Sequence, residues 1–212
     1  MGEVTVRQAT DADLVELVGV LARAFYEDPQ FLWSLPDQRD RLRRIERIFD
    51  TILRYEALRH GGVQLAEDGQ GAVVGGAVWL PPHHWRDPLS RQLITAPGFL
   101  RGYGRRIGYG SAFQSACWQA HPREPHWYLY ILGVEPDLQG RGVGAALLRA
   151  GLERSDAAGL PAYLESSNLA NVPLYEHFGF RVTGRLALPP EAPEIPTMWR
   201  PADNVSRMCT DD

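Results

Sequence analysis

The chain has 212 residues, of which 44% are hydrophobic and 23% charged, and its formal net charge is -4. All 22 basic side chains are arginine, and lysine is absent. This excludes Schiff-base and pyridoxal chemistry, P-loop nucleotide hydrolysis and protein kinase activity, because each requires a lysine amine. The acidic balance argues against a nucleic-acid partner, whose phosphates require a basic surface. The chain shows no membrane-length apolar run, no signal pattern and only two distant cysteines, so we expect a cytoplasmic protein without a membrane partner.

The first half of the chain predicts strands and helices in alternation. In chain order, the expected elements are a strand at 4–7, helices at 12–26 and 37–59, and strands at 63–67 and 72–80. Asp28-Pro29 is expected to end the first helix. The arginines of the second helix alternate with acidic residues, and we interpret them as a solvated face with ion pairs. The last two strands flank the turn Asp68–Gly71 and predict a hairpin.

The second half contains the segment that is hardest to interpret. Residues 83–122 are rich in glycine and aromatic residues, with one helical stretch expected at 97–118. The remaining expected elements are strands at 126–134 and 162–166, helices at 142–158 and 172–178, and strands at 180–188 and 197–200. Mixed strands and helices predict an α/β sheet. We expect one domain at 1–200 and a C-terminal tail at 201–212.

A glycine-rich stretch joins the strand at 126–134 to the helix at 142–158. It is Gln139-Gly140-Arg141-Gly142-Val143-Gly144. Three glycines in five residues let the backbone approach a ligand closely, and the first N–H groups of a helix point outward at its positive end. Arg141 adds a forked cation. The stretch therefore predicts an anion site suited to a pyrophosphate, with a tight strand–helix connection that binds no ligand as the alternative.

These residues resemble the acetyl-CoA-binding motif of the GNAT superfamily of N-acetyltransferases. The likeness covers 132–134 and 139–144, and residues 165–180 resemble the Asn, Tyr and Gly-Phe pattern that follows in that family. Over about 121–181 the chain is most similar to bacterial small-molecule acetyltransferases of the puromycin N-acetyltransferase type. The shared pattern is His121-Pro122, Glu124-Pro125 and Trp127, then the glycine-rich stretch, then Leu164-Glu165, Asn171, Pro173 and Tyr175. The resemblance implies a mixed, mostly antiparallel central sheet. It also implies a V-shaped splay between two parallel middle strands and helices on both faces.

The resemblance further implies that acetyl-CoA is the co-substrate and that no metal takes part. The residues implied to bind it are Leu132, Val134, Gln139, Gly140, Arg141, Gly142, Val143, Gly144, Ala145, Asn168 and Asn171. Backbone N–H groups of about 140–145 would hold the pyrophosphate, and the strand that ends at Val134 would pair with the pantetheine arm. For the two asparagines, helix capping is the alternative role.

The implied reaction is direct attack by the amine of a small molecule on the thioester in a ternary complex, by a monomer or a homodimer. Tyr175 is expected to protonate the leaving thiolate, although a phenol is a weaker acid than a thiol by about 1.5 pK units. Its alternative role is aromatic packing. Glu165 is the expected base for the amine, with a structural hydrogen-bonded carboxylate as the alternative, and Glu135 is a weaker candidate.

Other interpretations of the sequence lead to different classes of protein. A non-catalytic acyl-CoA sensor of the same fold would bind the acetyl donor without turnover. Ser115–Trp118 with His121 partly resembles a cysteine hydrolase, but the Cys-Gly pair before such a nucleophile is absent. His83 and His84 are not expected to share a metal, because adjacent side chains of an extended segment point to opposite sides. The aromatic residues expected near an acceptor site are Tyr26, Phe31, Trp33, Trp79, Trp85, Tyr103, Tyr109 and Trp118.

Overall fold

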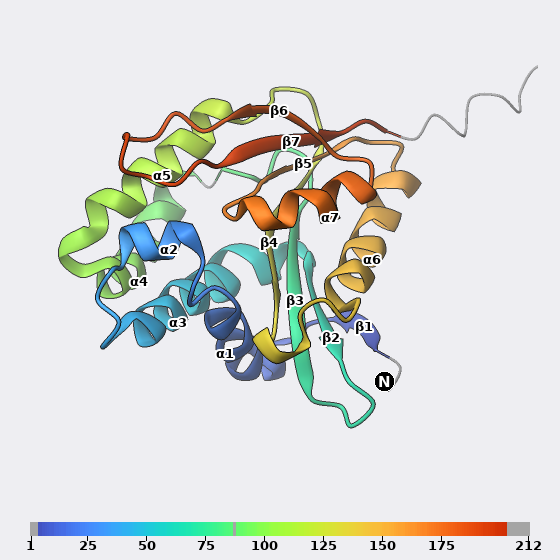
Figure 1. The fold of residues 1–212 in the computed structure, drawn as a ribbon, viewed down its shortest axis with the longest axis horizontal. Helices are drawn as coiled ribbons and strands as arrows, with labels where there is room; N and C mark the ends of the chain where they lie inside the picture. Colours follow the sequence, from blue (N-terminus) through green and yellow to red (C-terminus); the bar gives the residue numbers. More distant parts are fainter. Residues whose placement is uncertain (1–3, 87, 203–212) are drawn as a thin grey trace, which may run out of the picture.

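A seven-stranded sheet forms the centre of the molecule in the computed structural model, which describes residues 4–86 and 88–202 (Figure 1). The strands are β1 (Thr5–Gln8), β2 (Val63–Glu67), β3 (Val73–Leu80), β4 (Trp127–Val134), β5 (Ala162–Glu165), β6 (Arg181–Arg185) and β7 (Pro196–Arg200). Their order is β1-β2-β3-β4-β5-β7-β6, and only the β4–β5 pair is parallel. This confirms the predicted mixed, mostly antiparallel sheet. Of the expected tail, residues 203–212 lie outside the described part.

The two parallel strands pair only at their beginnings. The register joins Trp127 to Ala162 and Leu129 to Leu164, and it goes no further among the described residues. Beyond that point β4 continues along β3 as far as Val134, whereas β5, β7 and β6 turn away from it (Figure 1). Backbone N–H and C=O groups on this edge of β4 therefore face an opening instead of a strand. The predicted splay between parallel middle strands is present.

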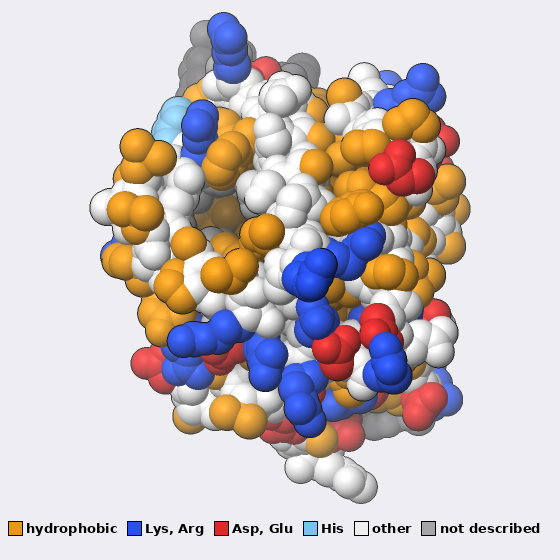
Figure 2. All heavy atoms as spheres, turned by 90° about the vertical axis from the view of Figure 1, so that its left-hand side faces the viewer, with side chains coloured by type: hydrophobic (Ala, Val, Ile, Leu, Met, Phe, Trp, Pro, Cys, Tyr) orange, Lys and Arg blue, Asp and Glu red, His pale blue; other side chains and the backbone are white. Residues whose placement is uncertain are grey.

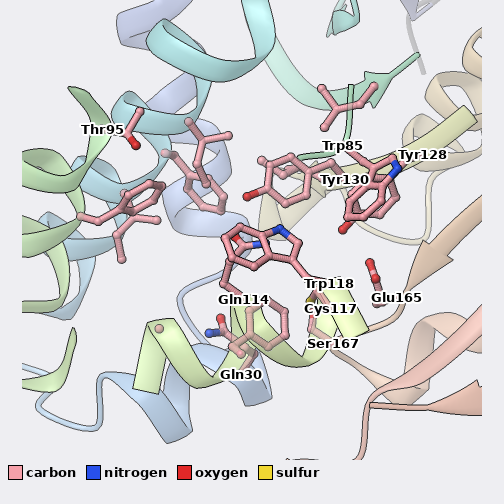
Figure 3. A pocket seen from close by; sticks show the side chains of 18 of the residues that line it. Gln30, Trp85, Thr95, Gln114, Cys117, Trp118, Tyr128, Tyr130, Glu165 and Ser167 are labelled. Atoms are coloured by element: carbon pink, nitrogen blue, oxygen red, sulfur yellow. The ribbon is translucent and has the colours of Figure 1, made fainter. Parts of the chain in front are cut away.

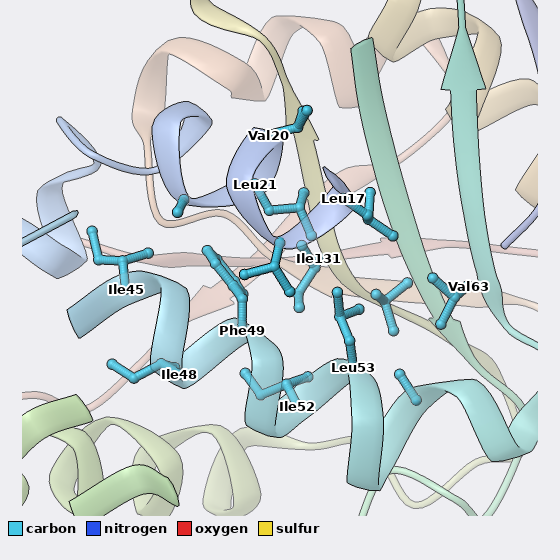
Figure 4. Packing of buried hydrophobic residues seen from close by; sticks show 14 of the residues in the cluster. Leu17, Val20, Leu21, Ile45, Ile48, Phe49, Ile52, Leu53, Val63 and Ile131 are labelled. Atoms are coloured by element: carbon cyan, nitrogen blue, oxygen red, sulfur yellow. The ribbon is translucent and has the colours of Figure 1, made fainter. Parts of the chain in front are cut away.

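Helices cover both faces of the sheet. They are α1 (Leu14–Ala24), α2 (Pro29–Ser34), α3 (Arg41–Ile52), α4 (Leu89–Tyr103), α5 (Ile107–Ala120), α6 (Val143–Ala157) and α7 (Val172–His177). Shorter helical turns are Asp11–Asp13, Leu53–Ala57, Leu58–His60, Gly104–Arg106, Pro136–Leu138 and Leu169–Asn171. On β3, Val78 belongs to the core formed with α1 and α3, while its neighbours Ala77 and Trp79 belong to the core formed with α6. This alternation follows the two-residue period of a strand and places one core on each face. Figure 4 shows the first of these cores, where Leu21 of α1 lies near Phe49 of α3.

Asp28-Pro29 begins a helix, although the sequence predicts that it only ends one. The Asp28 carboxylate accepts a hydrogen bond from the Gln30 N–H at 2.9 Å, which caps α2. Pro29 suits the first helical position, because the N–H that it lacks has no partner there. The predicted helix at 37–59 in turn begins only at Arg41 and continues beyond Ile52 as irregular turns.

One arginine of α3 is buried, so the expected solvated arginine face is wrong at that position. Arg41 is 2% exposed, and its guanidinium donates to the carbonyl oxygens of Leu35 at 2.8 Å and Pro36 at 2.9 Å. Arg44, by contrast, forms the expected ion pair with Asp40 at 2.7 Å on the surface. Arg41 therefore fastens the segment after α2 to α3.

We expect Arg41→Met to lower the free energy of unfolding by about 3 kcal/mol, because the buried carbonyl group of Leu35 and the partly buried one of Pro36 lose their charged donor. Arg43→Met is the matched control, since Arg43 is exposed on the same helix, and its effect should stay within about 0.5 kcal/mol. Urea unfolding followed by tryptophan fluorescence measures both variants. Equal effects would show that the hydrogen bonds of Arg41 do not stabilise the fold.

Two helices, α4 and α5, occupy the segment where the sequence predicts a single helical stretch. Gly98 and Gly102 bring α4 close to α3, because a Cβ atom on either glycine would overlap Thr51 or Ile48. Phe99 and Tyr103 of α4 face the interior, but four other large apolar residues of this helix are exposed; they are Leu89, Leu93, Ile94 and Leu100. Because glycines lie on the buried face of α4 and leucines on its exposed face, its sequence lacks the apolar periodicity by which an amphipathic helix is recognised. Among the described residues, no helix is long and apolar enough to span a membrane.

Candidate active site

A cavity of about 820 Å³ lies between the sheet and helices α3, α4 and α5. It reaches the splay, because Tyr130–Leu132 of β4 and Leu164 and Glu165 of β5 line it. Hydrophobic side chains surround a hollow on the side of the molecule shown in Figure 2, and Figure 3 shows the lining. The aromatic lining residues are Phe25, Phe31, Phe49, Trp85, Phe99, Tyr103, Phe113, Trp118, Tyr128, Tyr130 and Tyr175. A mostly apolar cavity of this size with a few polar groups is typical of a small-molecule site.

Glu165 provides the acidic group of this cavity wall (Figure 3). Burial raises the pKa of its carboxyl to about 7, and the hydroxyls of Tyr128 and Tyr163 offset that shift only in part. The buried Oε1 atom has no hydrogen-bond partner of normal geometry among the described residues. A carboxyl with a pKa near neutrality can gain and lose a proton under ordinary conditions, which is what a general base requires.

Tyr175 reaches the same cavity from α7, the helix that follows β5. Its ring packs edge-on against Phe180 at a centroid distance of 6.2 Å. No described residue forms a hydrogen bond with its hydroxyl, so that group is available to a ligand. Burial, followed by the nearby charge of Asp28, raises the pKa of Tyr175. The raised pKa makes the phenol a weaker acid, so donation to a thiolate requires a direct hydrogen bond between them.

The loop between β4 and α6 has the geometry of an anion-binding turn. Gly140 and Gly142 have φ angles of 71° and 88°, which glycine adopts without strain, and a Cβ atom at either position would meet open space. Gly142 is the N-cap of α6, and Ala145 lies in its first turn, where N–H groups have no acceptor within the helix. Arg141 is exposed between the two glycines. Open space, unused N–H groups and a cation therefore meet at the positive end of a 15-residue helix.

Other residues of the motif hold this loop against the end of β4. The Gln139 side chain donates to the Val134 carbonyl oxygen at 3.2 Å. Val143 is 3% exposed and packs in the core beneath α6. A Cβ atom at Gly144 would lie 3.6 Å from the Val134 side chain, so helix and strand approach closely there. Leu132 lines the cavity itself.

Asn168 and Asn171 have different surroundings in the structure. The Asn168 side chain accepts a hydrogen bond from the Ala170 N–H at 3.0 Å and caps the turn that follows. Asn171 lines the cavity instead. The geometry therefore favours the capping alternative for Asn168 and a ligand-facing position for Asn171.

Glu135 and Cys117, the two alternative catalytic groups, are poorly suited to catalysis in this structure. Glu135 forms a double ion pair with Arg23 of α1, at 2.7 and 2.9 Å. Cys117 lines the cavity, but burial, followed by the charge of Glu165, raises the pKa of its thiol, which disfavours the thiolate that a cysteine hydrolase needs. Within 4–86 and 88–202, no three His, Cys, Asp or Glu side chains gather in a way that could hold a metal ion.

The aromatic residues expected near an acceptor site divide into two groups. Those that line the cavity are Phe31, Trp85, Tyr103 and Trp118, whereas Tyr26, Trp33, Trp79 and Tyr109 do not. Trp79 is fully buried in the core beside α6. Sequence reasoning missed Tyr128 and Tyr130 as lining residues. The two-residue period of β4 was the available signal, because it places both on one face of the strand.

Comparisons with known proteins agree with this geometry. A profile of the acetyltransferase (GNAT) family matches residues 22–180. The chain is 29% identical over 179 residues to an uncharacterized N-acetyltransferase of Schizosaccharomyces pombe, and the aligned region covers 79% of this chain and 70% of that protein. It is 40% identical over 100 residues to mycothiol acetyltransferase of Streptomyces coelicolor, covering 45% of this chain but only 28% of that relative.

Solved structures show the same fold. A structure of histone acetyltransferase HPA2 and related acetyltransferase from Corynebacterium glutamicum has a TM-score of 0.75 and 29% identity, covering 95% of this chain and 97% of the other. Arylalkylamine N-acetyltransferase 2 from Aedes aegypti has a TM-score of 0.62 over 93% and 98% of the two chains, at 13% identity. The chain belongs to the acetyltransferase (GNAT) family. It is an acyltransferase enzyme, and members of this family generally use acetyl-CoA.

Proposed function

We propose that the protein transfers an acetyl group from acetyl-CoA directly to an amine of a small molecule, in a ternary complex. The observation that carries this proposal is a single cavity that joins the opening of the splay to Glu165 and Tyr175 within an apolar wall. Direct transfer also suits a site whose cysteine is buried and protonated, because no activated protein nucleophile is needed.

The donor fits the splay and the loop at the start of α6. Its pyrophosphate would accept hydrogen bonds from backbone N–H groups between Gly140 and Ala145, with Arg141 as an additional cation. Its pantetheine arm would lie along Leu132 and Val134, where backbone groups of β4 face the opening. Space for a ligand at both glycines supports this placement.

In the proposed reaction, the amine nitrogen attacks the thioester carbonyl, so that a C–N bond forms and the C–S bond breaks. Glu165 takes the proton that the amine loses. Tyr175 gives its hydroxyl proton to the sulfur and recovers one from solvent afterwards. The two residues line the same cavity, Glu165 from the end of β5 and Tyr175 from α7, which supports their roles in one transfer.

The acceptor is proposed to be an amine with an aromatic or aliphatic body, because the cavity beyond Glu165 is mainly apolar. Likeness in fold to an arylalkylamine N-acetyltransferase is in keeping with that class. The finer proposal, an enzyme of the bacterial puromycin N-acetyltransferase type, rests on the sequence pattern of 121–181. Acceptor specificity varies more readily than the donor site within one fold. Domain limits of 1–200, a monomeric or homodimeric state and a cytoplasmic location are further proposals, the last supported by the free Cys117.

Incubation with acetyl-CoA and a panel of amines tests the function. We expect release of free thiol together with a product heavier by one acetyl group in mass spectrometry. Binding of acetyl-CoA without thiol release for any amine would favour the sensor alternative. Absence of binding would contradict the proposed donor site.

Tyr175→Phe is expected to lower kcat at least tenfold with little change in the affinity for acetyl-CoA, because only the proton donor is lost. Stopped-flow thiol detection and calorimetric titration of acetyl-CoA measure the two quantities. Tyr103→Phe removes another buried phenol of the same cavity, on α4, and should leave kcat within about twofold. If Tyr175→Phe instead weakens acetyl-CoA binding and leaves kcat intact, Tyr175 is a packing residue.

A further inference from the structure

Two buried histidines contact each other at the wall of the acceptor cavity. His121 follows α5, His126 precedes β4, and their Nε2 atoms lie 3.0 Å apart. They are 8% and 2% exposed. His121 lines the cavity, whereas His126 lies behind it with its Nδ1 2.6 Å from the carbonyl oxygen of Glu124. The two rings therefore form a chain of polar contacts that runs from the carbonyl oxygen of Glu124 to the cavity wall.

These contacts determine where the protons of both rings lie. A carbonyl oxygen only accepts, so the Nδ1 of His126 must carry a hydrogen and donate it to Glu124. In a neutral ring the Nε2 of His126 is then an acceptor. The Nε2 of His121 must therefore carry the hydrogen of the contact between the rings. The Nδ1 of His121 is left with a lone pair, and no described residue forms a hydrogen bond with it.

The surroundings keep His121 neutral and fix its ring. Trp85 stacks on it at 3.9 Å between centroids, and Tyr128 and Tyr163 meet it edge-on at 4.9 and 5.1 Å. Burial, followed by the charge of His126, lowers the pKa of His121 to about 3.

The pKa of His126 is also lowered, by burial, although Glu124 opposes that shift through its carbonyl and its charge. His83 adds to the lowering. Both rings are consequently uncharged at neutral pH, as the tautomer assignment requires.

Resting on the proposed function, we propose that the Nδ1 of His121 accepts a hydrogen bond from the acceptor substrate, and that His126 serves to hold that tautomer. The preferred acceptors are then amines whose apolar body carries a second donor, an O–H or N–H group, in addition to the reactive amine. His121 lines the cavity beside aromatic side chains, so a substrate O–H or N–H that reaches its Nδ1 gains a hydrogen bond in mainly apolar surroundings. His121 is thus a specificity residue and Glu165 retains the proton transfer.

Matched pairs of amines that differ by one hydroxyl test the preference. Phenethylamine against tyramine and hexylamine against 6-aminohexan-1-ol are suitable, and kcat/KM is compared within each pair. In at least one pair we expect the hydroxylated amine to be favoured roughly fivefold or more, the value of one hydrogen bond. His121→Phe should remove that preference, because it keeps a ring for stacking and loses the lone pair. His84→Phe should retain it, since His84 lines the same cavity but is exposed.

Nitrogen-15 NMR of the two imidazoles gives a readout that does not depend on turnover. We expect His121 to carry its hydrogen on Nε2 and His126 on Nδ1 at pH 7. The opposite tautomers, or equal kcat/KM within every pair in both wild type and His121→Phe, would overturn the inference. If no amine is acetylated, the proposed function fails. Calorimetric affinities of the same pairs, with His121→Phe as the reference, then decide the inference separately.

Discussion

Gly142→Glu is expected to abolish acetyl-CoA binding, with a loss of affinity of at least about 100-fold. Gly142 has a φ angle of 88°, which strains any residue with a Cβ atom, and the new carboxylate would enter the space proposed for the pyrophosphate. Repulsion between the two anions adds to the strain, and the positive end of α6 would be neutralised by the mutant side chain. Calorimetric titration with acetyl-CoA measures the loss.

Gly71→Glu is the matched control for that substitution. Gly71 also has a positive φ angle, 81°, and a Cβ atom there would likewise meet open space, but it lies in the turn between β2 and β3. The same strain and the same charge are thus introduced away from the splay. We expect acetyl-CoA affinity within about twofold of wild type. Equal losses in both variants, or tight binding by Gly142→Glu, would contradict the phosphate site.

Glu165→Gln is expected to lower kcat/KM by about 100-fold and to remove the acidic limb of the pH profile. A base acts only when deprotonated, and the pKa of Glu165 is raised to about 7. The wild-type rate should therefore rise as pH passes through about 7 and level off above it. Thiol release between pH 5.5 and 9 measures the profile. Glu176→Gln, an exposed change on α7, should leave that limb in place.

The pH dependence of the free energy of unfolding gives an independent test of the raised pKa of Glu165. Its folded-state pKa lies above the ordinary value of 4.5, so between about pH 4.5 and 7 the native state holds a proton that the unfolded state releases. The contribution of this carboxyl group to the free energy of unfolding is therefore fully present below about pH 4.5 and is lost as the pH rises through about 7. Glu165→Gln should therefore be more stable than wild type at pH 8, by up to about 3 kcal/mol, and the difference should vanish below pH 4.5. A difference independent of pH would show that Glu165 is not buried as described.

The sequence predicted the sheet and the glycine-rich loop between β4 and α6 because those features depend on local patterns. The turn at 68–71 between two apolar runs defines β2 and β3, and glycines at 140 and 142 have the positive φ angles that the motif demands. The resemblance added the splay, which no local pattern could reveal, since it depends on β4 and β5 pairing for only three residues each. The placement of Glu165 and Tyr175 in one cavity likewise follows from that long-range geometry.

The parts that the sequence did not predict depend on contacts between distant segments. Arg41 belongs to an arginine-rich helix and is buried only because the segment after α2 turns its carbonyl groups toward it. Helix α4 packs through glycines, which sequence patterns associate with turns. The contact between His121 and His126 is close in sequence, but its proton arrangement depends on the carbonyl of Glu124, which no side-chain pattern encodes.

The packing of α4 on α3 also determines how this enzyme can change its choice of substrate. Gly98 and Gly102 set the separation of the two helices, and α4 supplies one wall of the acceptor cavity, far along the chain from β5 and α7. A single methyl group at either glycine would push that wall outward without altering Glu165 or Tyr175. In the proposed function, acceptor size and bond-making chemistry therefore depend on separate elements, so substitutions at the two glycines are expected to change the cavity and leave the proposed transfer residues in place.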